Sequence, residues 1–170
     1  IDTAPLYGFG DVESALSECL SGRRNRVELL GKVGLRWDDE HGDVLFEFED
    51  ASGKRRRVRR DCRPEAIRRD VEESLVRLRA DHIDLCQTHH PARRVPIAEA
   101  PGALEDLVDE GKIRHIGVSN FTGPEIEGAL AALERHPLAS DQLEYNLVKR
   151  TADREVLPLS RKHGFGLLAY

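Results

Sequence analysis

Short apolar runs alternate with amphipathic stretches along most of the 170-residue chain. Residues 11–21 show this best, because Val12, Ala15, Leu16 and Leu20 recur at the spacing of one helix face. Similar spacing predicts helices over 64–78, 101–110 and 153–162, the last bent by Pro158, and a capping box at 122–125 opens another. Apolar runs predict strands at 1–2, 27–33, 83–87, 113–118, 143–145 and 165–170. Regular alternation of strands and helices indicates a parallel α/β fold.

One segment, near residues 36–60, breaks this rhythm. Residues 44–50 alternate apolar and acidic side chains, 51–53 form a turn, and 54–60 carry six positive charges in seven positions. This pattern predicts a β-hairpin whose acidic and basic strands pair with each other. A phosphate or nucleic-acid patch is the alternative for the basic run, but self-neutralisation is favoured. Because the hairpin follows a strand, it could overhang an active site and help select substrate.

Polar side chains lie where successive apolar runs end. Asp2 ends the first run, Tyr7 follows it after a turn at Pro5, Lys32 lies near the end of the second, and His89 follows the third. A carboxylate, a phenol, an amine and an imidazole at successive strand exits form a set of groups that can handle protons.

These residues resemble the catalytic tetrad of the aldo-keto reductases. The resemblance rests on Asp-x-Ala-x-x-Tyr-Gly at 2–8, Lys-Val-Gly at 32–34 and Gln-x-His at 87–89, with further matches at 111–121 and 142–146. It implies a (β/α)8 TIM barrel, of which about six strands are visible, with the hairpin as an insertion. Such barrels typically need about 250 residues. We therefore expect residues 1–170 to form a single barrel domain that is incomplete at both ends.

The resemblance implies NADPH-dependent reduction of an aldehyde or ketone, a reversible reaction. Tyr7 is expected to act as general acid, because a nearby ammonium such as that of Lys32 makes a phenol a better proton donor, and Asp2 keeps the lysine charged and in place. His89 would donate a hydrogen bond to the carbonyl oxygen. His90 is the weaker candidate, since neighbours on a strand point to opposite sides.

For the cofactor, the resemblance assigns Ser119, Asn120 and Gln142 to the nicotinamide carboxamide. Amide and hydroxyl side chains offer the donors and acceptors that a primary amide needs. Tyr170 matches the position whose ring stacks on the nicotinamide. NADPH or NADP+ is the expected cofactor and NADH is not excluded. No Gly-x-Gly-x-x-Gly follows a strand, which argues against a Rossmann domain, and no metal is expected.

Composition narrows the range of partners. A net charge of −5 and a pI of about 5.8 give no overall attraction to nucleic acid or anionic membranes. No apolar run is long enough to span a bilayer. Three cysteines without metal-type spacing fit a reducing compartment, so a cytoplasmic protein is expected. The sequence predicts no oligomeric state and does not identify the carbonyl substrate.

Two other functions stay open at this stage. A cofactor-binding regulatory subunit, similar to the potassium-channel β subunits that resemble this family, could keep the whole tetrad. A truncated, inactive chain is suggested by length alone. Carbonyl-dependent oxidation of NADPH distinguishes an enzyme from either alternative.

Overall fold

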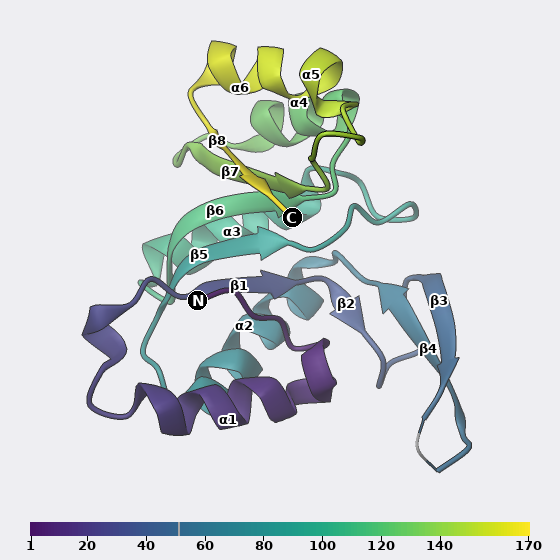
Figure 1. The fold of residues 1–170 in the computed structure, drawn as a ribbon, viewed down its shortest axis with the longest axis vertical. Helices are drawn as coiled ribbons and strands as arrows, with labels where there is room; N and C mark the ends of the chain where they lie inside the picture. Colours follow the sequence, from purple (N-terminus) through teal and green to yellow (C-terminus); the bar gives the residue numbers. More distant parts are fainter. Residues whose placement is uncertain (51) are drawn as a thin grey trace.

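A five-stranded parallel sheet forms the centre of the molecule, as the alternating pattern predicts. The computed structural model describes residues 1–50 and 52–170. Neighbouring strands follow chain order in this sheet, which runs β1-β5-β6-β7-β8 (Figure 1). Its strands are β1 (Leu30–Val33), β5 (Ile83–Thr88), β6 (Ile113–Ser119), β7 (Leu138–Leu143) and β8 (Gly166–Ala169). Asp2 adds a single parallel bridge to Leu30 beyond the β1 edge.

Helices follow the strands and pack against the sheet. They are η1 (Tyr7–Gly10), α1 (Asp11–Leu20), η2 (Arg24–Arg26), α2 (Pro64–Leu78), α3 (Glu99–Asp109), α4 (Gly123–Ala132), α5 (Ala152–Glu155) and α6 (Leu157–His163). Helix α1 packs on α2, α2 on α3, and α3 on α4. Pro64 begins α2, where its missing N–H costs no hydrogen bond. The predicted capping box is present, since Thr122 and Glu125 hydrogen-bond at the start of α4.

Three predicted elements differ from the structure. The strand expected at 143–145 is wrong, because β7 lies earlier; buried Ser140 and Asp141 interrupt the apolar pattern that would have marked it. The strand expected over 27–33 is regular only from Leu30. The single bent helix expected over 153–162 is two helices that meet at Val156, close to Pro158, which cannot donate a backbone hydrogen bond.

The register of the sheet decides which side chains share a face. Lys32 pairs with Gln87, Gln87 with Gly117, and Gly117 with Ser140, so all four point to the same side. A side chain at Gly117 would meet Ser140 Oγ at 2.7 Å and Gln87 Cγ at 2.8 Å. Glycine therefore leaves room on this face for the polar side chains of the neighbouring strands.

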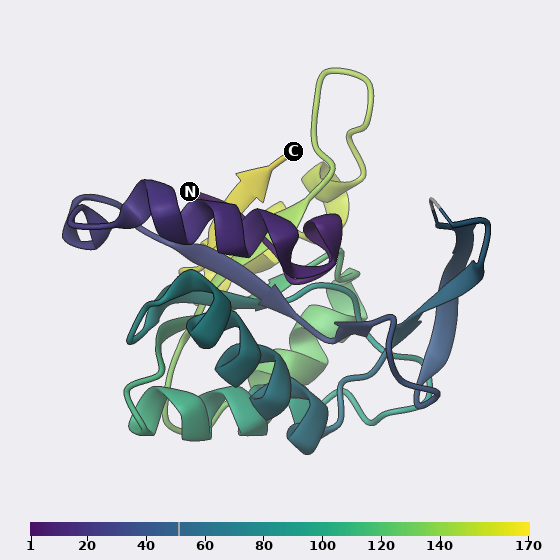
Figure 2. The ribbon, with the colours of Figure 1, turned by 90° about the horizontal axis from the view of Figure 1, so that it is seen from below.

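The predicted hairpin is confirmed. Strands β3 (Asp43–Glu49) and β4 (Arg55–Arg60) pair antiparallel, and β2 (Leu35–Arg36), which the sequence did not predict, completes a three-stranded sheet in the order β2-β4-β3. The hairpin stands out from the body of the molecule (Figure 2). Ala51, in the predicted turn, lies outside the described residues.

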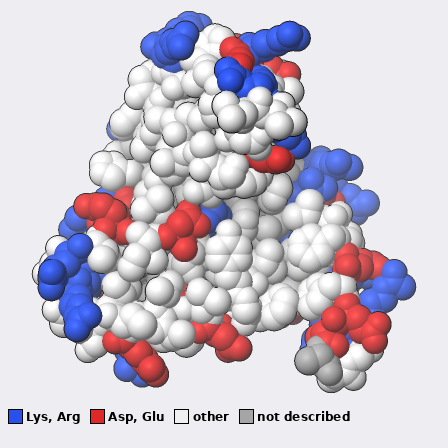
Figure 3. All heavy atoms as spheres, viewed as in Figure 1, with Lys and Arg blue, Asp and Glu red and all other residues white. Residues whose placement is uncertain are grey.

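Acidic and basic side chains of the hairpin pair with each other, as expected. Glu47 forms ion pairs with Arg55 and Arg57, and Asp50 forms one with Arg56. Figure 3 shows both signs of charge interspersed on this part of the surface. The basic run thus has partners within its own hairpin. Across the described residues, no helix is both long and apolar enough to cross a membrane.

Candidate active site

One cavity brings together every residue that the sequence nominated for catalysis or cofactor binding. It has a volume of about 580 Å³ and lies where the strands of the parallel sheet end. Its lining consists of Asp2, Tyr7, Lys32, His89, His90, Ser119, Asn120, Gln142, Ala169 and Tyr170. In a parallel α/β fold, the carboxyl ends of the strands are the usual location of an active site.

An ion pair lies at one side of the cavity. Lys32, on β1, is 2% exposed, and its Nζ pairs with the Asp2 carboxylate. The second Asp2 oxygen accepts a hydrogen bond of 2.9 Å from Gln142 Nε2, on β7. Asp2 thus links the first and fourth strands of the sheet across the cavity, and its charge-assisted bond fixes the position of the Lys32 Nζ.

Tyr7 begins the 3-10 helix η1 and faces this pair. Lys32 Nζ lies 5.2 Å from the centre of the Tyr7 ring, within the range of a cation–π contact. The Tyr7 ring also meets His89 edge-on, with 6.0 Å between ring centroids. Tyr7 is 38% exposed. Among the described residues its hydroxyl has no hydrogen-bond partner, so it is available to a bound molecule.

His89 is held just past the end of β5, where its backbone N–H donates to the Val33 carbonyl at 2.9 Å. Burial, together with repulsion from Lys32 and His90, lowers the pKa of His89 to about 3. The imidazole is therefore neutral near pH 7, with one ring nitrogen that donates and one that accepts.

His90 also lines the cavity, which corrects the expectation that it would point away. Its ring stacks on that of His89, with 5.5 Å between centroids and 13° between planes. Strand alternation does not apply here, because β5 ends at Thr88. Burial and the nearby Arg60 lower the pKa of His90 as well. Sequence reasoning missed this residue, and only the length of the strand could have revealed it.

A second group of polar side chains forms a hydrogen-bonded set across the cavity. Ser119 Oγ donates to the Gln142 carbonyl at 2.8 Å, and Asn120 Nδ2 donates to the His89 carbonyl at 3.0 Å. The Tyr170 hydroxyl donates to Asn120 Oδ1. Asn120 has a φ of 61°, the left-handed conformation that asparagine tolerates better than most residues. These bonds fix the β6 exit against β7.

The polar lining of the cavity does not include a metal cluster. Among the residues that the structure describes, no three His, Cys, Asp or Glu side chains are grouped to hold a metal ion. Of the three free cysteines, Cys62 and Cys86 are buried and Cys19 is exposed.

Comparison with known proteins identifies the family. The model of the aldo/keto reductase family matches residues 1–170. The chain is 36% identical over 172 residues to the aldo-keto reductase YhdN of Bacillus subtilis (strain 168), covering 100% of this chain and 46% of that protein. It is 35% identical over 174 residues to the NADH-specific methylglyoxal reductase of Escherichia coli (strain K12), covering 100% and 51%.

Solved structures give the same result. A glycerol dehydrogenase from Gluconobacter oxydans superposes with a TM-score of 0.85 at 39% identity, covering 100% of this chain and 48% of that one. An aldo/keto reductase from Klebsiella pneumoniae, solved with NADP and acetate, superposes with a TM-score of 0.75 at 31% identity, covering 100% and 51%. The chain thus spans about half the length of the relatives it matches. The α/β class predicted from the sequence is confirmed by the parallel sheet of five strands and by these neighbours, and the chain belongs to the aldo/keto reductase family.

Proposed function

We propose that the protein reduces an aldehyde or ketone to the alcohol with NADPH, and that the cavity between Tyr7, Lys32, Asp2 and His89 is where this happens. The observation that carries the proposal is the meeting of these four side chains in one cavity, where the Tyr7 hydroxyl has no hydrogen-bond partner among the residues that the structure describes. Reduction of a carbonyl requires a proton for the developing alkoxide and a group that stabilises its charge meanwhile.

Tyr7 is the proton donor in this proposal. Its ring lies beside the buried ammonium of Lys32, which favours the phenolate that remains after the proton has left. Asp2 holds that ammonium and is itself held by Gln142. The charge that forms on Tyr7 is therefore balanced by a cation already in place, so little reorganisation is needed at the moment of reaction.

His89 orients the carbonyl in this proposal. Because its pKa is lowered to about 3, the imidazole near pH 7 donates a hydrogen bond without carrying a positive charge beside Lys32. Its edge-on contact with Tyr7 brings an N–H donor and an O–H donor to the same part of the cavity. Two donors aimed at one oxygen fix both the position and the direction of the carbonyl.

The residues across the cavity fit a nicotinamide. Ser119, Asn120 and Gln142 present hydroxyl and amide groups, and in the described contacts Gln142 Oε1 accepts no hydrogen bond, which leaves an acceptor for a carboxamide N–H. Tyr170, on the same lining, offers an aromatic face. When bound, such a cofactor supplies the hydride.

NADPH is proposed ahead of NADH. The Klebsiella pneumoniae structures were solved with NADP and with NADPH, whereas the relative from Escherichia coli is named NADH-specific. Binding both cofactors to the purified protein, with affinity as the readout, decides between them independently of turnover.

The test of the proposal is oxidation of NADPH that depends on an added carbonyl. Absorbance of the reduced cofactor is followed against a panel of aldehydes and ketones, and alcohol formation is confirmed in the product. Turnover of at least one carbonyl supports an enzyme. Tight cofactor binding without turnover across the panel would contradict the proposal and favour a regulatory cofactor-binding protein.

A further inference from the structure

The turn that carries Tyr7 has an unusual backbone. Gly8, Phe9 and Gly10 have φ angles of 61°, 56° and 99°, so three successive residues are left-handed. Glycine adopts this conformation freely, but a phenylalanine does so at a cost in free energy. A glycine at position 9 would avoid that cost. Because the sequence has Phe9 there, contacts made by the phenyl ring must offset the cost. Strain of this kind persists only where surrounding contacts over-determine the backbone.

The ring of Phe9 lies against two aromatic side chains of the inserted segment. Phe9 stacks on Phe48 of β3, with 5.1 Å between centroids and 6° between planes. It also packs on Trp37 at 5.3 Å and 59°. We call Phe9, Trp37 and Phe48 the aromatic clamp. Offset-stacked and tilted ring pairs at these separations are attractive beyond the area they bury.

Buried charges attach the clamp to the body of the protein. Arg36 is 2% exposed, and its guanidinium lies 5.9 Å from the Trp37 ring centre. Asp70, on α2, accepts hydrogen bonds from Arg36 Nη1 at 2.5 Å and from the Gly34 N–H at 2.7 Å. The start of the insertion is thus fixed to α2 by charge-assisted bonds, so Trp37 projects from a rigid base.

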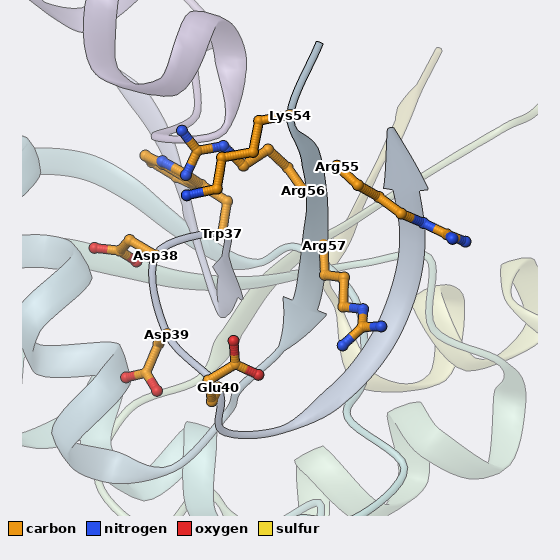
Figure 4. Close-up of a pocket in the computed structure, with 8 residues that line it drawn as sticks. All are labelled: Trp37, Asp38, Asp39, Glu40, Lys54, Arg55, Arg56 and Arg57. Carbon is orange, nitrogen blue, oxygen red and sulfur yellow. The ribbon is translucent and has the colours of Figure 1, made fainter. Parts of the chain in front are cut away.

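The far side of the clamp is supported within the hairpin. Phe48 pairs in register with Arg56, whose Nε donates to Asp50 Oδ2 at 2.8 Å. Figure 4 shows the Arg56 and Lys54 side chains extending beside Trp37, with Asp38 and Glu40 across the opening. A cavity of about 290 Å³ lies between this strand and residues 37–40. Strands β1 and β5 point toward this hairpin (Figure 1), so the hairpin lies beyond the strand ends near which the cavity residues Lys32 and His89 are found.

We infer that the aromatic clamp holds the left-handed turn and thereby positions Tyr7 for proton transfer. The inserted hairpin is then part of the machinery of the proposed reaction, although none of its described residues lines the active-site cavity. This inference rests on the proposed function in what it says of catalysis. What it says of structure, that the aromatic clamp stabilises the turn, does not depend on whether the protein turns over a carbonyl.

The variant Phe48→Ala tests both the effect of the clamp on catalysis and its effect on the turn. We expect kcat to fall roughly tenfold, because displacement of a reacting group by a fraction of an ångström is enough for such a loss. The KM for the carbonyl and the dissociation constant of NADPH are expected to stay within about twofold, since Phe48 is not among the residues that line the active-site cavity. Phe48→Tyr, which keeps the ring, is expected to restore kcat.

Hydrogen exchange reports on the turn without any substrate. The N–H groups of Tyr7 and Phe9 donate within the turn, to the carbonyls of Ala4 at 3.0 Å and Leu6 at 3.2 Å. In Phe48→Ala these amides are expected to exchange faster than in the wild type. Val44→Ala is the matched control: Val44 lies on the same strand, is 39% exposed and is not aromatic, so it takes part in none of the ring contacts of the clamp. It should change neither exchange nor kcat.

A double variant shows whether the clamp acts through Tyr7. In a Tyr7→Phe background, Phe48→Ala should cause no further loss of the residual rate, because the group it positions is gone. A further tenfold loss there, or unchanged exchange in Phe48→Ala, would overturn the inference. If the wild type turns over no carbonyl, the proposed function fails, and the exchange rates alone then decide whether the clamp holds the turn.

Discussion

The two ends of the parallel sheet both carry buried charges, but they use them differently. At the amino end, Asp84 accepts hydrogen bonds from the Leu29 N–H at 2.8 Å, Arg24 Nη2 at 2.7 Å and Arg114 Nη1 at 3.1 Å. At the carboxyl end, Lys32 and Asp2 form a pair that borders an open cavity. The residue types are alike, and the difference lies in how completely the polar atoms are satisfied within the protein.

The comparison distinguishes charged groups that stabilise the fold from charged groups that border a cavity where a substrate can react. Each carboxylate oxygen of Asp84 has a protein partner, and so has each oxygen of Asp2. Around Lys32, by contrast, the Tyr7 hydroxyl has no partner in the described part of the chain, and the His89 imidazole is neutral near pH 7. Substitutions at the amino end should therefore change stability, and substitutions at the carboxyl end should change turnover.

The largest effect is expected for Tyr7→Phe. Loss of a general acid lowers kcat by about 10²–10⁴-fold. The free energy of unfolding should change by less than about 0.5 kcal/mol, because the hydroxyl has no protein partner to lose among the described residues. Steady-state kinetics and thermal unfolding of the same preparation give both numbers. If most of the activity survived, Tyr7 would not be the proton donor.

Asp84→Asn is expected to have the opposite profile. It removes the charge of a buried carboxylate that pairs with Arg24 and Arg114, and it should destabilise the protein by about 3 kcal/mol with kcat unchanged. Asp81→Asn is the control, since Asp81 is 86% exposed and pairs with His82 at the surface, and it should leave stability unaltered. Chemical denaturation measures both. If Asp84→Asn lowered kcat without lowering the free energy of unfolding, the proposed distinction between the two ends of the sheet would be wrong.

The pH dependence of the Asp84 contribution follows from its pKa. Burial opposes its ionisation, but the Leu29 N–H and Arg24 outweigh burial and lower the pKa of Asp84. A carboxyl with a lowered folded pKa adds stability above its unfolded pKa of about 3.9, and that stability disappears as pH falls through the folded value. The difference in stability between wild type and Asp84→Asn should therefore shrink in acid.

A smaller effect is expected from His89. Its pKa is lowered to about 3 in the folded protein by burial, Lys32 and His90, whereas the unfolded chain binds a proton near pH 6.5. Acid therefore favours the unfolded state between these values, and His89 should account for about 2 kcal/mol of lost stability from pH 7 to pH 5. His89→Asn should remove that part of the acid sensitivity. NMR should find no titration of the His89 ring between pH 5 and 8.

The smallest effect is expected from the exposed ion pairs of the hairpin. Glu47 pairs with both Arg55 and Arg57, whose side chains are exposed, and ion pairs of this kind contribute little. Glu47→Gln should leave turnover and the unfolding temperature unchanged, in contrast to Phe48→Ala on the same strand. A clear loss of activity in Glu47→Gln would mean that charge, rather than the aromatic clamp, connects the hairpin to the site.

The sequence predicts the regular part of this fold because the spacing of apolar residues agrees there with the residues that begin and end helices. Pro64 and the apolar stripe of the following residues mark α2 at both ends, and Thr122 with Glu125 marks the start of α4. Strand β7 is not predicted correctly, because Ser140 and Asp141 are buried although an argument from apolar spacing counts polar residues as exposed. Local sequence cannot tell which polar side chains a sheet will bury, since burial depends on neighbouring strands.

The candidate site is predictable for a different reason. Its residues lie at the ends of parallel strands, and parallel topology places those ends together however far apart they are in the chain. Asp2 and Gln142 meet across 140 positions in this way. The aromatic clamp is not predictable, because Phe9, Trp37 and Phe48 come from a turn, a loop and an inserted strand whose mutual approach no periodicity encodes. The assignment of roles to the site residues stays a prediction.

The most direct test of the central claim follows the hydride itself. NADPH carrying deuterium at the transferable position of its nicotinamide is incubated with the protein and an aldehyde, and the alcohol is analysed by mass spectrometry. The account predicts one deuterium on the carbinol carbon with wild-type protein, and loss of most of this product with Tyr7→Phe although NADPH still binds. Bound cofactor with no labelled alcohol from any aldehyde tested would contradict it.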